Sequence, residues 1–233
     1  MTMAISTTPT YVPPKKRGMG CFGCGCLILV LLVIIAVGVI AGIGYMGYTG
    51  VVGITSPTPA AVPSFQATDD VYNSARQKLA DFDHDVKNHQ AATIQLSADE
   101  INALIARSPE IAKNNIHALV SLTKNEGRVQ ANVPTNGLSQ GIIKDRYFNL
   151  DTSFEINFDP STKSILLTFH TLQFGSKEFM GPNSENAAAM QSLTPAFNQS
   201  LNNGIRNNPD GAALLNQAKS IEIKDGELVI ETQ

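Results

Sequence analysis

A long uncharged, apolar stretch near the N-terminus constrains this chain more than any other feature. No Asp, Glu, Lys or Arg occurs over the 51 positions from Gly18 to Thr68. Residues 26–48 read CLILVLLVIIAVGVIAGIGYMGY, and as an α-helix they span roughly 34 Å, enough to cross the hydrocarbon core of a membrane. The run is longer than the roughly 7–15 apolar residues of a cleaved signal peptide, so we predict a retained signal-anchor.

Basic residues on one side of this segment predict its orientation. Lys15, Lys16 and Arg17 precede it, and the next basic residue is Arg76. Because the basic flank of a transmembrane helix stays in the cytoplasm, we expect a single-pass protein of the cytoplasmic (inner) membrane with its C-terminal part outside. The predicted organisation is a short cytoplasmic tail (1–25), a transmembrane helix (26–48), a linker containing Pro, Gly, Ser and Thr (49–66) and an extracytoplasmic α+β domain (67–233).

All three cysteines, Cys21, Cys24 and Cys26, lie just before the apolar run. A structural zinc site needs four ligands, and the nearest histidine, His84, is expected on the other side of the membrane. We therefore predict no metal site here and interpret the cysteines as small, weakly polar residues that enter the membrane on the reducing side. Whether they are modified, for example by thioacylation, the sequence leaves open.

A pair of glycines inside the predicted membrane helix raises the hypothesis that two copies of the chain associate through this helix. Gly38 and Gly42 form a GxxxG pattern, which lets two helices approach closely in lipid. A homodimer through this helix, which would signal inward, is therefore an alternative hypothesis.

The charge and cysteine content of the outer domain argue against several kinds of binding partner and against a disulfide-stabilised fold. Without residues 15–17, 14 basic and 20 acidic residues remain, which gives a net charge of −6. A negative domain is a poor match for nucleic acid or for an anionic bilayer surface as its main partner. The absence of cysteine after Cys26 means that the domain depends on a hydrophobic core and not on disulfides.

Hydrophobic periodicity predicts the elements of the outer domain. Apolar residues spaced by three or four predict helices over 69–89 and 190–205, and Ser97 with Glu100 forms a capping box for another helix. Asp225-Gly226 predicts the turn of a C-terminal hairpin. Alternating apolar residues predict strands over 116–123, 128–133, 147–158 and 164–174. We therefore expect an α+β fold with a curved antiparallel sheet packed with helices.

The segment 164–174 differs from the other predicted strands because it carries apolar residues at both parities. Ile165, Leu167 and Phe169 share one face, and Leu166, Leu172 and Phe174 share the other. A strand that is apolar on both faces is covered twice, by helices or by a ligand. Our candidates to line a ligand groove, or to fill the core beneath it, are Phe148, Phe154, Leu166, Phe169, Leu172 and Phe174.

Two short motifs resemble known catalytic and metal-binding patterns in part. GLSQG (137–141) matches the GxSxG nucleophile elbow, so Ser139 and His170 are the catalytic residues of an alternative hypothesis. The elbow needs a strand before the serine and a helix after it, whereas the next predicted element here is a strand. DFDHD (81–85) imitates the start of a calcium loop but lacks the glycine and glutamate of an EF-hand. We predict no metal and no other cofactor.

Residues 96–111 read LSADEINALIARSPEI, and they follow a membrane helix, a spacer and a short strand. With the later alternating strands and an NFDP turn that ends at Pro160, this layout resembles the YpmS-like membrane-anchored bacterial envelope proteins. The resemblance implies a non-catalytic domain that handles a lipid or another apolar ligand, or that assists partner envelope enzymes. It carries over no catalytic residue.

The expected function is that of a single-pass, membrane-anchored envelope protein. Its extracytoplasmic domain would bind a partner protein or an apolar or lipid ligand without catalysis, and it would have no nucleic-acid partner. The alternative is a membrane-tethered serine hydrolase that uses the GLSQG loop.

Overall fold

The computed structural model describes residues 53–137, 145–181, 184 and 187–233. The predicted membrane helix (26–48) with Gly38 and Gly42, the three cysteines and Ser139 lie outside the described residues. Within the described part, none of the helices has the length and hydrophobicity needed to cross a membrane.

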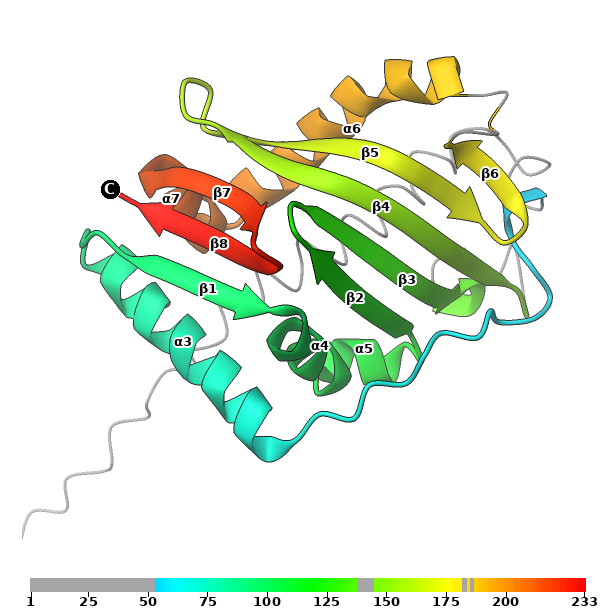
Figure 1. Ribbon diagram of the computed structural model, residues 1–233, viewed down its shortest axis with the longest axis horizontal. Helices are drawn as coiled ribbons and strands as arrows, with labels where there is room; N and C mark the ends of the chain where they lie inside the picture. Colours follow the sequence, from blue (N-terminus) through cyan, green and yellow to red (C-terminus); the bar gives the residue numbers. More distant parts are fainter. Residues whose placement is uncertain (1–52, 138–144, 182–183, 185–186) are drawn as a thin grey trace, which may run out of the picture.

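The described chain folds into two antiparallel sheets with helices packed around them (Figure 1). The helices are α3 (Asp69–Lys87), α4 (Ala98–Ala106), α5 (Pro109–Lys113), α6 (Ala187–Arg206) and α7 (Pro209–Gln217), with a 3-10 turn, η2 (Thr135–Gly137). The strands are β1 (Thr93–Ser97), β2 (His117–Thr123), β3 (Glu126–Pro134), β4 (Tyr147–Asp159), β5 (Ser164–Phe174), β6 (Lys177–Met180), β7 (Ala218–Lys224) and β8 (Glu227–Thr232).

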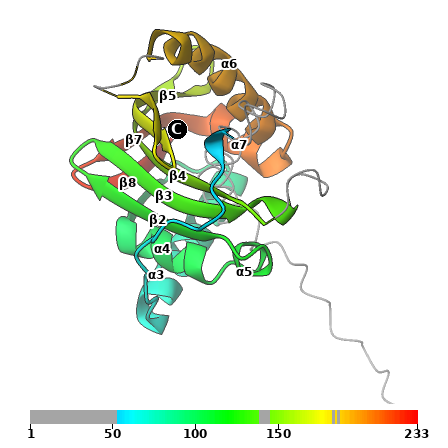
Figure 2. The ribbon, with the colours of Figure 1, turned by 90° about the vertical axis from the view of Figure 1, so that its right-hand side faces the viewer.

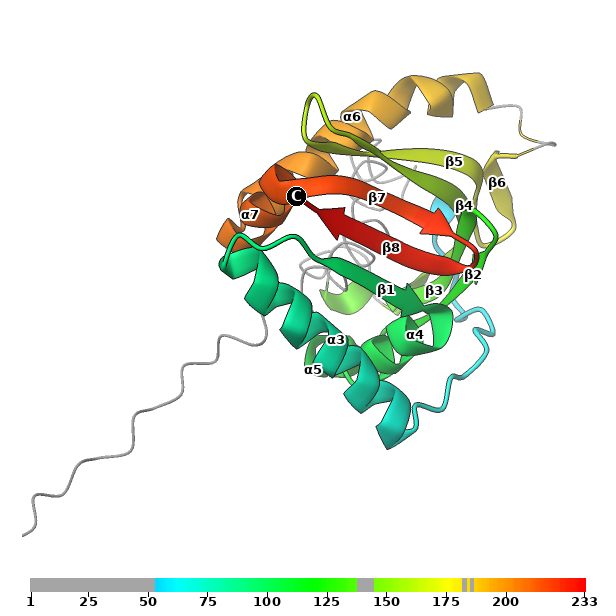
Figure 3. The same cartoon turned by 60° about the vertical axis from the view of Figure 1, so that its left-hand side comes forward.

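The predicted α+β class is confirmed, but the strands form two sheets where we expected one. One sheet has the order β1-β8-β7 and the other β2-β3-β4-β5-β6. The C-terminal hairpin joins β1, which lies far away in sequence, because β8 pairs antiparallel with it from Thr93–Glu231 to Ser97–Glu227. Figures 1 and 3 show α3 beside β1 and α6 beside β5.

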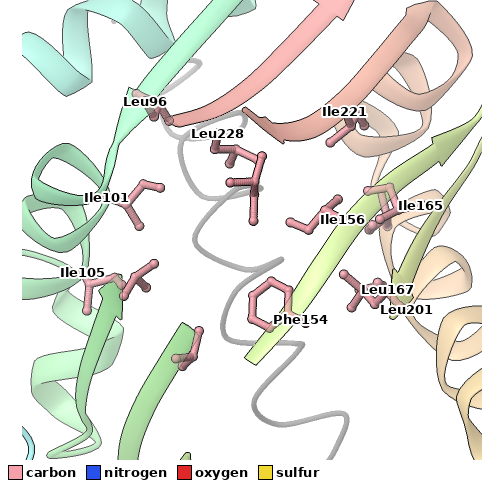
Figure 4. Close-up of a cluster of buried hydrophobic side chains, with 14 of the residues drawn as sticks. Leu96, Ile101, Ile105, Phe154, Ile156, Ile165, Leu167, Leu201, Ile221 and Leu228 are labelled. Atoms are coloured by element: carbon pink, nitrogen blue, oxygen red, sulfur yellow. The ribbon is translucent and has the colours of Figure 1, made fainter. Parts of the chain in front are cut away.

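The hydrophobic core lies where the two sheets and the helices meet. Figure 4 shows apolar side chains from α4, β1, β4, β5, β7 and α6 that converge on one cluster. Leu96, Phe154, Leu167, Leu201 and Ile221 are each at most 1% exposed. One continuous core therefore joins both sheets.

The first helix of the domain forms as its periodicity predicts. Ala75, Leu79, Phe82 and Val86, spaced by four, three and four, are the buried residues of α3. The Thr68 side chain accepts a hydrogen bond from the amide of Val71 and caps the helix.

The predicted capping box of α4 is confirmed, and it anchors α3 as well. The Glu100 amide donates to Ser97 Oγ over 3.2 Å, and the Ser97 amide donates to Glu100 Oε2 over 3.0 Å. Lys78 and Ser74 of α3 also donate to the Glu100 carboxylate, over 2.9 and 3.0 Å. Burial raises the pKa of Glu100, but the hydrogen bonds from Lys78, the Ser97 amide and Ser74 outweigh it, so the pKa lies below its ordinary value.

A β-bulge in β5 corrects the expectation of a strand that is apolar on both faces. Ser153 pairs with Thr171 and Phe154 with Phe169, so His170 is an extra residue without a partner in β4. The extra residue reverses the alternation, and Leu172 and Phe174 therefore lie on the same core face as Phe169. The predicted opposite face keeps only Leu166, which is 41% exposed.

Asparagine side chains attach α6 to the free edge of β5. Asn202 accepts from the Ile165 amide over 2.8 Å and donates to the Ile165 carbonyl over 2.7 Å. Asn198, one turn earlier, makes the same pair of bonds with Leu167 over 3.0 and 3.2 Å. The two amides replace a missing neighbouring strand, and α6 is continuous through Pro195.

The predicted linker does not stand free of the domain. Residues 54–60, which we call the strap, cross the outer face of the five-stranded sheet near the start of β4 (Figure 2). Ser56 and Tyr147 exchange two backbone hydrogen bonds of 2.9 and 2.8 Å. Asn149 donates to the Thr58 carbonyl over 2.9 Å and accepts from the Ala60 amide over 2.8 Å. The strap is therefore bound to the sheet and is not a free spacer.

Candidate functional site

A polar cleft occupies the outer face of the five-stranded sheet, opposite the core. Its volume is about 520 Å³. The residues that line it are Ser121, Thr123, Glu126, Arg128, Asp151, Ser153, Thr171, Gln173 and Glu178. We call this set the polar cleft.

Strand register brings these side chains together. Across β2, β3, β4 and β5, one row consists of Ser121, Arg128, Ser153 and Thr171, each paired with the next. The neighbouring row continues through Gln130, Asp151, Gln173 and Glu178. Because side chains alternate between the two faces of a strand, every one of these polar residues points away from the core.

An ion pair of fixed geometry lies in the cleft. Arg128 donates to both carboxylate oxygens of Asp151, from Nε over 2.8 Å and from a terminal nitrogen over 2.6 Å, and Gln130 adds a third bond over 3.1 Å. The hydrogen bond from Arg128 holds the pKa of Asp151 below its ordinary value, and the same bond raises the pKa of Arg128. Both side chains therefore stay charged over the physiological pH range.

Hydroxyl groups extend this network toward β5. Thr171 Oγ1 donates to Ser153 Oγ over 3.0 Å and accepts from the Ser153 amide over 3.0 Å. The cleft thus offers hydroxyls, amides and carboxylates, with three acidic side chains against one guanidinium. Such a surface suits recognition of polar or cationic groups by hydrogen bonds.

The candidate groove residues mostly lie in the core. Phe148, Phe154, Leu172 and Phe174 are between 1% and 5% exposed. Phe169 is partly buried and makes edge contacts with the rings of Phe154 and Phe197, whose centroids lie 6.4 and 5.2 Å away. Of the six, Leu166 alone is an exposed large hydrophobic residue. Of the two roles considered from sequence, lining a groove and filling the core, the structure places these aromatic rings in the second.

The two residues of the hydrolase hypothesis are not both described. Ser139 lies outside the described residues. His170, the bulge residue of β5, lies with Nε2 3.2 Å from Glu155 Oε1, and both side chains are more than 40% exposed. Among the described residues, no hydroxyl forms a hydrogen bond with His170.

Metal binding has no candidate in the part of the chain that the structure describes. There, no three His, Cys, Asp or Glu side chains come close enough to hold an ion. Asp81, Asp83 and Asp85, which imitate a calcium loop in sequence, lie within the helix α3.

Sequence reasoning missed the polar cleft, although part of its pattern was visible. The alternation of 147–158 predicts a strand with one polar face, but the sequence assigns that face no role. Matching polar positions occur on 117–123, 126–134 and 164–174, and four strands with the same alternation indicate a shared polar face once their order is known.

No protein-family model, curated protein or solved structure matches this chain. Its function must therefore be inferred from its own residues and their arrangement.

Proposed function

We propose that this chain is a single-pass, membrane-anchored envelope protein whose extracytoplasmic domain binds a partner protein through the polar cleft, without catalysis. The observation that carries the proposal is the contrast between the two faces of the five-stranded sheet. One face of the sheet is buried in the core. The other face carries the hydroxyl, amide and charged groups that line the polar cleft of about 520 Å³.

The burial of the aromatic candidates favours a protein partner over a lipid. A lipid chain needs an apolar surface of several side chains, and four of the six groove candidates are at most 5% exposed. The cleft residues instead resemble the polar part of a protein interface, where hydrogen bonds and charge pairs determine specificity.

The strap supports presentation of the cleft close to a membrane. The predicted membrane helix ends at Tyr48, and the described strap begins at Ile54, which is 4% exposed. At about 3.3–3.6 Å per residue, the intervening residues reach at most roughly 20 Å. The domain would therefore stay near the bilayer, with the cleft beside the bound strap.

Site-specific photo-crosslinking of the full-length chain in its native membrane tests this proposal. A photoreactive p-benzoylphenylalanine at Ser121, an exposed cleft position, should give a discrete crosslinked product. The same group at Asn203, an exposed position on α6, is the control and should give none. Gln173→Trp, which fills the cleft, should abolish the product. Equal crosslinking from both positions, or none from Ser121, contradicts the proposal.

The hydrolase alternative has one observation in its favour, the pairing of His170 with Glu155, which orients an imidazole as in catalytic triads. A fluorophosphonate probe applied to the full-length protein distinguishes the two functions. Labelling that disappears in Ser139→Ala would replace the binding function by a hydrolase. We expect wild-type protein and variant to remain equally unlabelled.

A further inference from the structure

A second groove lies between α3 and the outer edge of β1, away from the polar cleft. Its volume is about 350 Å³. It is lined by Lys78, Asp81, Phe82 and Asp85 of α3 and by Ala92, Thr93, Ile94 and Gln95 at β1. We call it the edge groove. Figures 1 and 3 show the helix and the strand side by side along its length.

The backbone of β1 presents hydrogen-bonding groups to this groove. β1 pairs with β8 on one side, where Ala92 accepts from the Thr232 amide over 2.9 Å. In an antiparallel strand, the backbone N–H and C=O groups of alternate residues point to opposite sides. The backbone groups of Thr93 and Gln95 therefore point away from β8. The bond from Lys78 Nζ to the Gln95 carbonyl, 3.0 Å long, confirms this direction.

Part of that edge has no partner. The Ser97 amide donates to Glu100, and the Gln95 carbonyl accepts from Lys78, so the C-terminal end of β1 is satisfied. Among the described residues, no hydrogen-bond partner exists for the amide of Gln95 or for the amide and carbonyl of Thr93. These groups form a short, open strand edge.

At two other strand edges of this fold, asparagine side chains bond backbone groups that point away from the neighbouring strand. Asn102 of α4 accepts from the Val120 amide over 2.8 Å and donates to the Val120 carbonyl over 2.7 Å, which satisfies the outward-pointing backbone groups of Val120 in β2. Asn198 and Asn202 do the same for β5. Natural proteins cover or charge strand edges because an open edge pairs with other chains. Unlike Val120, Ile165 and Leu167, Thr93 of β1 has no hydrogen-bond partner for its backbone groups among the described residues, and a groove lies beside it.

We infer that the edge groove binds an extended segment of a partner protein, which adds to β1 as a short strand and places a Lys or Arg side chain against Asp81 and Asp85. The added strand would accept from the amides of Thr93 and Gln95 and donate to the Thr93 carbonyl. Phe82 and Ile94, each 3% exposed, form the floor beneath it.

The preference for a basic side chain follows from the charges along the groove. Lys78 is already engaged by Glu100, whose carboxylate lies 2.8 Å from its ammonium nitrogen. Asp81 contacts the neutral Gln77, and Asp85 lies 3.3 Å from His84. Among the described residues, neither aspartate forms an ion pair with a Lys or Arg side chain, so their negative charge attracts a cation.

The same charges disfavour a second copy of this chain as the occupant. Pairing two β1 edges would bring Asp81 and Asp85 of both copies near one another, and like charges repel. The inference rests on the proposed binding function, but it names a different surface and a different chemistry of recognition, so the two can fail separately.

A peptide titration on the full-length protein in detergent micelles tests the inference. The probe is the peptide Thr-Val-Lys-Val-Thr-amide with fluorescein on its N-terminal amine, so that the Lys side chain stays charged, and binding is followed by fluorescence anisotropy. We expect saturable binding that Thr93→Pro weakens about tenfold or more, because proline removes the amide and blocks strand pairing. Thr93→Val, which keeps the amide, is the matched control and should bind within about twofold of the wild type.

Further probes separate the charge from the strand pairing. The double variant Asp81→Asn with Asp85→Asn should bind the peptide about fivefold more weakly, and a peptide with Glu in place of Lys should not bind. A peptide that is N-methylated at both valines leaves the protein unchanged and should also lose binding. This last probe keeps the test valid if Thr93→Pro fails to fold.

Several results would overturn the inference. They are the absence of saturable binding, equal binding of the N-methylated peptide, equal binding of the Glu peptide, or a folded Thr93→Pro variant that binds like the wild type. A dimer in micelles that Thr93→Pro converts to a monomer would identify a second copy as the occupant instead. Loss of crosslinking at Ser121 with normal peptide binding would refute the polar cleft and leave the edge groove standing.

Discussion

Asn202 tests whether a side-chain amide takes the place of a β-strand at the edge of β5. Its amide satisfies both the N–H and the C=O of Ile165, and the residue is only 4% exposed, so water cannot take over these bonds. Asn202→Leu would leave two buried backbone groups without partners. Each unsatisfied group costs about 1–3 kcal/mol, so we expect a loss of about 3 kcal/mol in the free energy of unfolding.

Such a loss is measurable because a whole domain is stable by only about 5–15 kcal/mol. For a domain of this size, the melting temperature should fall by about 6–12 °C. The assay is urea and thermal unfolding of the full-length protein in detergent micelles, followed by near-ultraviolet circular dichroism of the packed tyrosine and phenylalanine side chains. Amide hydrogen exchange of residues 164–168 should accelerate in the same variant.

Asn203→Leu is the matched control, because the same change is made one residue away at an exposed position of the same helix. It should alter the free energy of unfolding by no more than about 0.5 kcal/mol. If Asn202→Leu and Asn203→Leu unfold alike, the amide does not satisfy the edge of β5, and the argument for covered edges is wrong.

Three further predictions concern the helix cap, the strap and the core. The pKa of Glu100 is lowered in the folded state, so its charge stabilises the domain at pH values above its ordinary pKa of 4.5. This contribution to stability is lost as the pH falls through the lowered pKa. In Glu100→Gln, the free energy of unfolding should therefore fall less steeply with decreasing pH in the acid range. Asn149→Ala should release the strap and speed hydrogen exchange of the Ala60 amide about tenfold or more in exchange mass spectrometry. Gly127→Ala should destabilise the domain by about 1–3 kcal/mol in urea unfolding, because the new Cβ would lie 2.9 Å from Ile223 Cδ1.

Each of these has a control of the same chemistry. Glu110→Gln, at an exposed position, should keep the acid limb of the wild type. Asn125→Ala, in an exposed turn, should leave exchange at Ala60 unchanged. Gly53→Ala should be neutral, because a Cβ there meets no atom within 4 Å. An unchanged acid limb in Glu100→Gln, unchanged exchange in Asn149→Ala, or neutrality of Gly127→Ala would each contradict its prediction.

Local patterns in the sequence were sufficient for most elements of the outer domain. The spacing of apolar residues in α3, the capping box of Ser97 and Glu100, and the alternation of β4 all predict what the structure has. The hairpin turn is equally local, since Asp225 and Gly226 take positive φ of 53° and 82°. These features depend on contacts within a few residues, so the chain alone determines them.

The candidate sites needed the pairing of distant segments. The bulge at His170 moves Leu172 and Phe174 into the core, and it exists only in the register that β5 adopts against β4. The polar cleft requires the order β2-β3-β4-β5-β6, and the edge groove requires that β8 pairs with β1.

The sequence by itself determined where helices, strands and turns form, which residues are apolar enough for a core, and that residues 26–48 are predicted to cross a membrane. Only the tertiary structure decided which faces are buried, where the strap binds and that a groove lies beside the open edge of β1. The physical reason is that the sequence does not distinguish an asparagine that bonds a distant backbone from one that faces solvent. Asn149 and Asn202 become structural only when folding brings unpaired backbone groups from 37 or more residues away to their amides.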